Sequence, residues 1–198
     1  MKRLIFALIF VLIAGFYVFS QIGCGRAQGS AKSDKTTFLL LISEQNIEGP
    51  QRAWWMSEVD LSTVESMVAQ KLIAGGYEVL EPSVASKQVN ISKAFKRADL
   101  PENDSVTLGR NLKANYVISG KAVASAGGTV PQSTMRSCYA NVTAKLIRVS
   151  DGKVVAYLDA AGSTVHPDVI TGGREALTNA GQDLADKVIN AMAQEGGK

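Results

Sequence analysis

Three segments within residues 112–159 alternate between apolar and polar side chains, and this alternation constrains the fold more than any other feature of the chain. Successive side chains of a β-strand point to opposite faces of its sheet. The middle segment has one apolar and one polar phase, Ala140, Val142, Ala144 and Leu146 against Asn141, Thr143 and Lys145. The dipeptide Asp151-Gly152 is typical of a turn between the last two segments. The pattern predicts an antiparallel meander with one face on a core and the other closer to water.

The residues before this meander predict a parallel β-α-β unit. Residues 36–42 form a continuous apolar run, which is typical of a buried strand, and residues 77–80 form a second short strand. Residues 61–74 between them are expected to be helical, because Ser62 and Glu65 have the spacing of a capping box. Two strands joined through such a helix are expected to lie parallel with a right-handed crossover.

Further helices are predicted on both sides of the meander. Residues 82–100 contain two short helical stretches, and a capped helix is expected over residues 104–112, with Val106 and Leu112 facing inward. After the meander, residues 162–173 predict a loop. Residues 174–193 predict a final helix that crosses the sheet, with Leu177, Ala180, Leu184, Val188 and Ala191 on its inward face and Gly181 allowing close approach. The fold class is therefore α+β: a mixed β-sheet with a parallel β-α-β start, an antiparallel three-strand meander and a long C-terminal covering helix.

The amino-terminal residues have the pattern of an export leader. Two basic residues precede an apolar run over residues 4–19. Three outcomes stay open: lipid attachment at Cys24, cleavage after Ala27, or an uncleaved anchor, since the run is just short of a comfortable membrane span. Each outcome would place the rest of the chain outside the cytoplasm.

This leader suggests a division of the chain into three parts. We expect residues 1–23 to be a leader or anchor, residues 24–35 a flexible tether, and residues 36–198 a single periplasmic domain. The expected location is the periplasmic side of a bacterial envelope, with the outer membrane as the favoured anchor. Without residues 1–23 the formal net charge falls from +3 to +1, so charge gives no reason to expect nucleic acid as a partner.

Catalytic chemistry is not indicated. His166 is the single histidine, in a segment predicted as a loop, and it is expected to be an exposed residue without a catalytic or metal-binding role. Glu44 and three nearby acids are expected to lie in a solvated loop. Cys138 shares the apolar phase of its strand and is expected to be buried and unreactive. We therefore expect no enzyme activity, no cofactor and no metal.

Partner binding is predicted at one short segment. Arg52, Trp54, Trp55 and Met56 are the residue types that anchor protein interfaces. One Trp could instead fold back and plug the core. A further alternative is a soluble periplasmic module that binds a small molecule or glycan by stacking it on Trp54 and Trp55.

Two stretches resemble a group of periplasmic proteins. Residues 108–120 end in Ala-Asn-Tyr-Val-Ile-Ser-Gly, and residues 142–155 form a strand followed by Ser-Asp-Gly-Lys-Val-Val. They are similar to passages of the curli-secretion lipoprotein, the lipoproteins that activate penicillin-binding proteins, the TolB amino-terminal domain and the middle domain of the flagellar assembly T protein. Arg148 departs from the group, which commonly has an acidic residue there.

The resemblance implies an α+β fold, an envelope location and a non-enzymatic role in assembly or regulation. The implied partners are envelope protein complexes: flagellar basal-body rings, a peptidoglycan synthase or a secretion complex. The membrane would be reached through an amino-terminal lipid or anchor.

Overall fold

The computed structural model describes residues 35–54, 61–80 and 100–197. The chain divides into two compact units, residues 1–34 and residues 35–198, and everything below concerns the second unit. The predictions for the leader, for Cys24, for Trp55 and Met56, and for the short helices of residues 82–99 lie outside the described residues.

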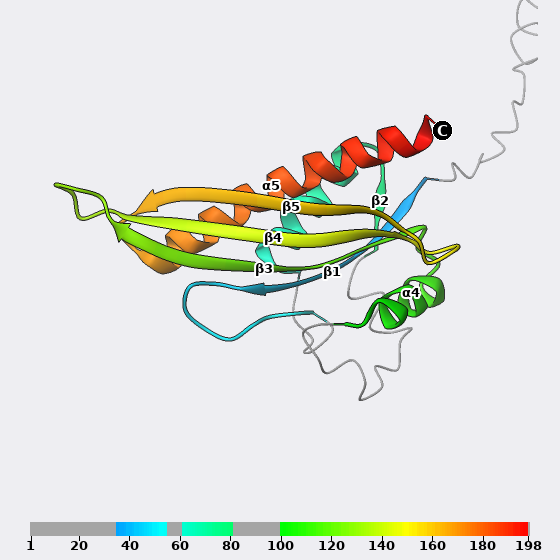
Figure 1. The fold of residues 1–198 in the computed structure, drawn as a ribbon, viewed down its shortest axis with the longest axis horizontal. Coiled ribbons are helices and arrows are strands. Elements are labelled where there is room, and N and C mark those ends of the chain that lie inside the picture. The colour runs from blue at the N-terminus through cyan, green and yellow to red at the C-terminus, as the bar shows by residue number, and fades with distance from the viewer. Residues whose placement is uncertain (1–34, 55–60, 81–99, 198) are drawn as a thin grey trace, which may run out of the picture. The chain divides into compact units, whose positions relative to one another are not determined.

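The described part of the second unit is a five-stranded mixed sheet with three helices (Figure 1). Its elements are β1 (Thr37–Gln45), α2 (Thr63–Ala74), β2 (Glu78–Val79), α4 (Glu102–Asn111), β3 (Tyr116–Thr129), β4 (Arg136–Arg148), β5 (Val154–His166) and α5 (Val169–Gly196). The strand order is β2-β1-β3-β4-β5. Strand β1 runs parallel to both β2 and β3, whereas β3, β4 and β5 are antiparallel. The predicted α+β class, the parallel start and the meander are confirmed.

Strand β4 shows the predicted two-faced pattern. Its inward residues Ala140, Val142, Ala144 and Leu146 are at most 2 % exposed, and Cys138 is a fully buried free thiol in the same phase. The predicted turn forms at Gly152, which has a φ of 69° and donates its N–H to the Arg148 carbonyl at 2.9 Å. The left-handed φ explains why glycine is suited to this position.

Helix α2 begins with the predicted capping box. The Ser62 hydroxyl accepts from the Glu65 N–H at 3.3 Å, and Glu65 Oε2 accepts from the Ser62 N–H at 3.0 Å. The other Glu65 oxygen accepts from the Ile42 N–H of β1 at 2.8 Å. Glu44 also contacts α2, because its Oε2 accepts from the Val64 N–H at 2.8 Å. The prediction of a solvated Glu44 was wrong: it lies in β1, 6 % exposed, where its carboxylate satisfies a helix amide.

The main core lies between one face of the sheet and the helices α2 and α5. Of the predicted inward stripe of α5, Leu177, Ala180, Leu184 and Val188 are buried and Ala191 is partly buried. Gly181 allows α5 to approach α2, since an added Cβ would lie 3.1 Å from the Met67 Cβ. The predicted loop over residues 162–173 was wrong: β5 continues to His166 and α5 begins at Val169. Gly162 lies in β5. A glycine is needed at this position because α5 crosses it so closely that a Cβ would lie 2.2 Å from the Ala176 carbonyl oxygen.

Smaller differences concern two other elements. Helix α4 begins at Glu102 rather than near residue 104, with Pro101 at its N-cap position. Proline suits the first residues of a helix because their N–H groups have no intrahelical partner. Gly172 and Gly173, which belong to the segment predicted as a loop, are buried in the first turns of α5, against Cys138 and Asn46 respectively.

A second, smaller core covers part of the opposite sheet face. It joins α4 and Trp54 to residues of β1 and β3, among them Leu39, Leu41 and Val117. Val106 and Leu112 are buried here, as predicted. This second core reaches Ile147 at the end of β4, and the outer part of β3, β4 and β5 on this face remains exposed.

Candidate functional site

The side chain of Trp54 belongs to the second core. It is 6 % exposed, and its Nε1 donates to the Leu40 carbonyl at 2.9 Å. The neighbouring Arg52 exchanges two backbone hydrogen bonds with Glu44, at 2.7 and 2.8 Å, while Arg52 as a whole is exposed. Trp54 therefore takes the plugging role that the sequence left open. The contact of Arg52, Trp55 and Met56 with a partner stays a prediction.

Within the described part of the chain, the exposed surface with the largest aromatic side chains lies on the meander. We call it the open sheet face: Lys121, Tyr139, Asn141, Thr143, Lys145, Tyr157, Asp159 and Val165. Register places these residues on the side of the sheet away from α5, because they alternate with the buried residues of the main core. Tyr157 is 71 % exposed, Tyr139 47 % and Val165 51 %. Large aromatic side chains at such exposure are typical of protein interfaces.

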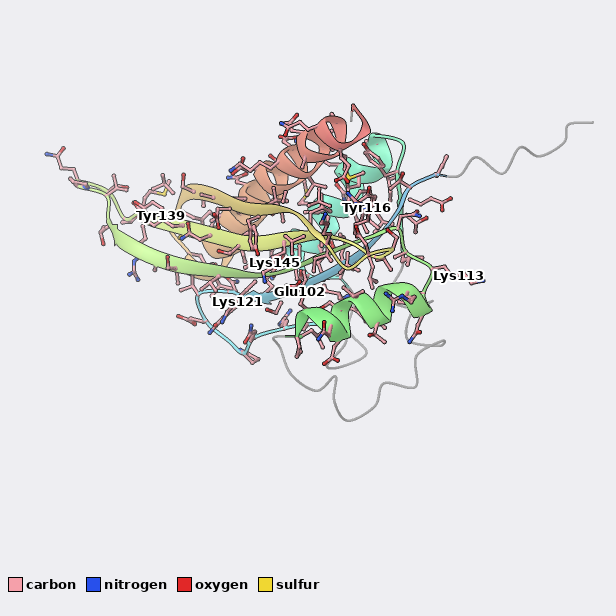
Figure 2. The ribbon with its side chains drawn as sticks, turned by 45° about the vertical axis from the view of Figure 1, so that its right-hand side comes forward. Glu102, Lys113, Tyr116, Lys121, Tyr139 and Lys145 are labelled. Atoms are coloured by element: carbon pink, nitrogen blue, oxygen red, sulfur yellow. The ribbon has the colours of Figure 1, made fainter. Side chains whose placement is uncertain are left out.

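A shallow pocket of about 280 Å³ lies where this face meets the start of α4. Lys145 is its central cation: Nζ is 3.0 Å from Glu102 Oε2 and 5.5 Å from the centre of the Tyr157 ring. The hydrogen bond and charge of Glu102 raise the pKa of Lys145. Lys121 also lines the pocket, and its side chain makes no ion pair within the described residues. Figure 2 shows Lys121, Lys145 and Glu102 close to the start of α4, with Tyr139 farther along the sheet.

The outer edge of β5 is occupied by side chains from α5. Lys187 Nζ donates to the Asp159 carbonyl at 2.6 Å, Asp183 Oδ2 accepts from the Ala161 N–H at 3.1 Å, and Asn179 Nδ2 donates to the Ser163 carbonyl at 3.0 Å. Lys187 also bonds Asp183 at 2.8 Å, and this bond lowers the pKa of Asp183. Because these backbone groups are bonded, the middle of the edge cannot readily pair with another strand.

His166 is the last residue of β5, and it contacts Asp168, the residue directly before α5. Its Nδ1 accepts from the Asp168 N–H at 3.0 Å. Asp168 is the N-cap of α5, and its bonds from Thr171 lower the pKa of the Asp168 carboxyl. Across residues 35–54, 61–80 and 100–197, no group of three or more His, Cys, Asp or Glu residues is arranged to hold a metal ion.

The exposed tyrosines of the open sheet face were not singled out from the sequence. The signal was present: Tyr139 and Tyr157 occupy the polar phase of strands whose other phase is apolar. An aromatic side chain in the water-facing phase of an alternating strand is a marker of a binding surface. Trp54 drew attention because of its residue type, although the segment after β1 pairs back to that strand at Arg52 and lets Trp54 turn inward.

Comparisons with known proteins identify no family for this chain. No family model matches it, and no curated protein matches it. Among solved structures, a PelC dodecamer from Paraburkholderia phytofirmans matches with 20 % identity and a TM-score of 0.38, over 79 % of this chain and 88 % of that one.

Two further matches have similar coverage, and the second of them is named as a lipoprotein. The LpoB C-terminal domain from Salmonella enterica has 14 % identity and a TM-score of 0.38, over 67 % of this chain and 87 % of that one. Lipoprotein GNA1162 from Neisseria meningitidis has 15 % identity and a TM-score of 0.41, over 82 % and 98 %. The chain is thus similar to lipoproteins, but at these identities and TM-scores the likeness carries no argument about what it binds. Within the described residues, no helix is long and apolar enough to cross a membrane.

Proposed function

We propose that this chain is a non-enzymatic envelope protein, tethered to a membrane by lipid at Cys24, whose open sheet face binds a protein partner. In this role it assists the assembly or regulation of an envelope machine on the periplasmic side, such as a flagellar basal body, a peptidoglycan synthase or a secretion complex. The observation that carries the proposal is the exposure of Tyr139 and Tyr157 on one continuous strand surface.

The composition of this surface supports protein binding. Tyrosine offers a large contact area together with a hydroxyl that can hydrogen-bond, and tyrosines are frequent among the residues that dominate binding energy. The strand backbone between them is paired on both sides, because β4 lies between β3 and β5. Two cross-strand pairs, Lys145 with Tyr157 and Thr143 with Asp159, therefore project from a rigid platform. A rigid platform limits the entropy that is lost on binding.

The blocked edge of β5 supports docking on the face rather than strand addition. With Asp159, Ala161 and Ser163 bonded to α5, a partner strand has no free run of backbone groups at the middle of that edge. A lipid at Cys24 would then confine the face to one membrane and raise its effective concentration near partners there.

Site-specific photo-crosslinking in cells tests this proposal. A photoreactive amino acid is placed at Tyr139 or Tyr157, and at Ile73 as the matched control, because Ile73 is a 57 % exposed apolar residue of α2 on the opposite side of the sheet. We expect one discrete crosslinked species from positions 139 and 157 and none from position 73. The same crosslink should weaken about tenfold or more in a Cys24→Ala chain, since the tether no longer concentrates it.

Two results would contradict the proposal. Equal crosslinking from all three positions would show that the open sheet face is not a specific docking site. An unchanged crosslink in Cys24→Ala would remove the tether from the mechanism.

A soluble ligand-binding module is the alternative, now limited by the burial of Trp54. A ring that is 6 % exposed cannot be one half of a two-tryptophan stacking platform. Stacking of a small ligand would have to use Trp55 alone. The pocket at Lys145, with a volume of about 280 Å³, is slightly smaller than most ligand sites.

A further inference from the structure

A second pocket lies at the end of the sheet where the chain enters the domain. It encloses about 450 Å³. Its wall contains three cationic side chains, Arg110, Lys113 and Arg148, and no acidic one. We call this the basic pocket. Its remaining polar wall residues are Thr36, Asn115, Tyr116 and Ser150.

The three cations come from separate elements that tertiary folding brings together. Arg110 is in the last turn of α4, Lys113 follows that helix, and Arg148 ends β4. Asn115 connects these elements: its Oδ1 accepts from the Thr37 N–H at 2.7 Å, and its carbonyl accepts from the Val149 N–H at 2.9 Å. Figure 2 shows Lys113 and Tyr116 at this end of the domain, opposite to Tyr139.

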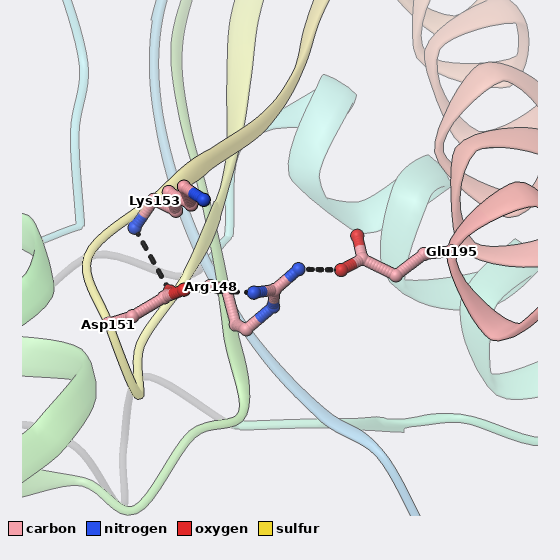
Figure 3. A network of polar contacts seen from close by, with 4 residues as sticks. All are labelled: Arg148, Asp151, Lys153 and Glu195. Atoms are coloured by element: carbon pink, nitrogen blue, oxygen red, sulfur yellow. Dashed lines mark hydrogen bonds and ion pairs between the residues drawn. The ribbon is translucent and has the colours of Figure 1, made fainter. Parts of the chain in front are cut away.

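The cations differ in how far they are already neutralised. Arg148 bonds Asp151 Oδ2 at 2.9 Å and also bonds Glu195 of α5 (Figure 3). Asp151 is held in place by the Lys153 N–H at 3.1 Å, and this bond together with the Arg148 charge lowers its pKa. Arg110 and Lys113 make no ion pair within the described residues. Among the residues that the structure describes, the pocket therefore has two positive charges without an ion-pair partner beside one fixed guanidinium.

This combination of cations and hydroxyl groups suits an anion with several oxygens, such as a phosphate group. Arginine and lysine are the residues that proteins use for phosphate oxygens, and arginine can bind two of them at once. The hydroxyl groups of Thr36 and Ser150 add neutral donors to the same wall. A carboxylate could pair with one cation, but a phosphate has enough oxygens to contact several at the same time.

The position of the basic pocket indicates the source of the phosphate. The chain enters the domain at Lys35, next to Thr36 of the pocket wall, and the segment before it includes Arg26 and Lys32. A domain that is held at this end would turn the pocket toward the surface that holds it. Membrane surfaces with anionic lipids attract such clusters of Lys and Arg.

We propose that the basic pocket binds the phosphate of an anionic phospholipid headgroup and thereby orients the domain on its membrane. This inference concerns a different surface from the open sheet face. Its choice of a membrane rests on the proposed tether at the amino-terminal end of the domain, for which an uncleaved leader would serve as well as a lipid at Cys24. Binding of the headgroup would leave Tyr139, at the far end of the sheet, directed away from the membrane.

Vesicle cosedimentation with residues 25–198 tests the proposal without the apolar leader. This fragment keeps the whole compact unit that holds both cores. Vesicles of phosphatidylcholine with phosphatidylglycerol are compared with vesicles of phosphatidylcholine alone, for the unaltered sequence and for Arg110→Gln with Lys113→Gln. Arg136→Gln with Arg174→Gln is the matched control, since it removes the same charge from exposed residues of β4 and α5. Thermal unfolding of each variant separates lost binding from lost stability, because cations also favour a helix carboxyl end.

We expect binding to anionic vesicles that is about 25-fold weaker in the Arg110/Lys113 variant, at roughly fivefold per charge, and nearly unchanged in the control. Titration with inorganic phosphate at constant ionic strength is the second arm. If only phosphate binds, and the Arg110/Lys113 variant loses that binding, the phosphate site stands and its source is a soluble ligand. Equal losses in both double variants would overturn the site, because the attraction would then be general. Absence of any response to vesicles and to phosphate would overturn it as well.

Discussion

Glu65 shows how one buried carboxyl can join two elements. It is fully buried, and its two oxygens accept from Ser62 at the start of α2 and from Ile42 in β1. Burial raises the pKa of Glu65 to about 7, although these backbone hydrogen bonds oppose the rise. The negative charge of Glu44, which binds the Val64 N–H nearby, adds to the rise.

The raised pKa predicts a stability that falls with increasing pH. In the unfolded chain Glu65 loses its proton near pH 4.5, whereas in the folded chain it keeps the proton to about pH 7. The folded state therefore binds more protons in this window, and its advantage is lost as the pH rises from 4.5 to about 7. The loss is on the order of 3 kcal/mol. Urea unfolding at several pH values measures it.

Glu65→Gln provides the comparison for this prediction. Glutamine keeps the shape and cannot ionise, so its free energy of unfolding should be flatter across the same pH range. Glu48→Gln, at an exposed acid after β1, should keep the slope of the unaltered protein. A parallel pH dependence in all three chains would show that Glu65 is not responsible.

At the scale of elements, α5 and β5 match in their repeat lengths. Asn179, Asp183 and Lys187 are four residues apart on the helix, a rise of about 6 Å, while alternate residues of the strand are about 6.7 Å apart. Because the two repeats nearly coincide, three successive helix side chains can reach Ser163, Ala161 and Asp159 in turn. The close approach at Gly162 makes this reach short enough for direct hydrogen bonds.

Removing these side chains should leave the edge of β5 open to pairing with another chain. We expect the triple variant Asn179→Ala, Asp183→Ala, Lys187→Ala to stay folded and to self-associate with increasing concentration, because β5 then offers unpaired backbone groups. Sedimentation velocity measures the association. The pair Lys71→Ala, Asp186→Ala removes an exposed ion pair between α2 and α5 without touching the edge and should leave the protein as it was. A triple variant that sediments like the unaltered chain would show that the caps do not protect the edge.

At the scale of the whole domain, the two cores share one sheet. Leu39 of β1 and Val117 of β3 face the second core, and their neighbours Leu40 and Ile118 face the main core. Neither core can therefore lose its packing without disturbing the strands that support the other. This arrangement favours a single cooperative unfolding transition.

Substitutions in either core should consequently lower the same global stability. Leu177→Ala in the main core and Leu39→Ala in the second core should each lower the free energy of unfolding by about 2–5 kcal/mol. The slope of this free energy against urea concentration should not change. Circular dichroism and tryptophan fluorescence measure the transition, and Trp54 contributes to the fluorescence from within the second core. Separate transitions for the two signals in either variant would mean that the cores unfold independently.

Much of the architecture was readable from local patterns. The two-phase alternation around Val142 predicted a strand with one buried face, and the capping box of Ser62 and Glu65 predicted the start of α2. These features depend on residues close in sequence, so their physical causes are present in any short stretch. The segment before α5 was misread because Gly162 and Gly172 suggest a loop. Their structural reasons are tertiary: α5 crosses β5 at Gly162, and Gly172 lies in α5 itself, packed against Cys138.

The candidate surfaces were less predictable than the fold. Trp54 was expected either at an interface or in the core, and only the packing of α4 against β1 and β3 decided for burial. The basic pocket combines Arg110, Lys113 and Arg148, whose proximity depends on the register of β4 with β3. The sequence of any one of these segments therefore cannot predict that the three side chains lie close together.

By itself, the sequence determined the element types, the faces that would be buried and the antiparallel order of the last three strands, because side-chain periodicity and turn residues act locally. The tertiary structure decided the insertion of β1 between β2 and β3, the covering of one sheet face by α5 and only part of the other by α4, and hence which side chains stay exposed. Exposure depends on what packs above a residue, and for Tyr157 and Lys113 that information comes from elements far away in the chain.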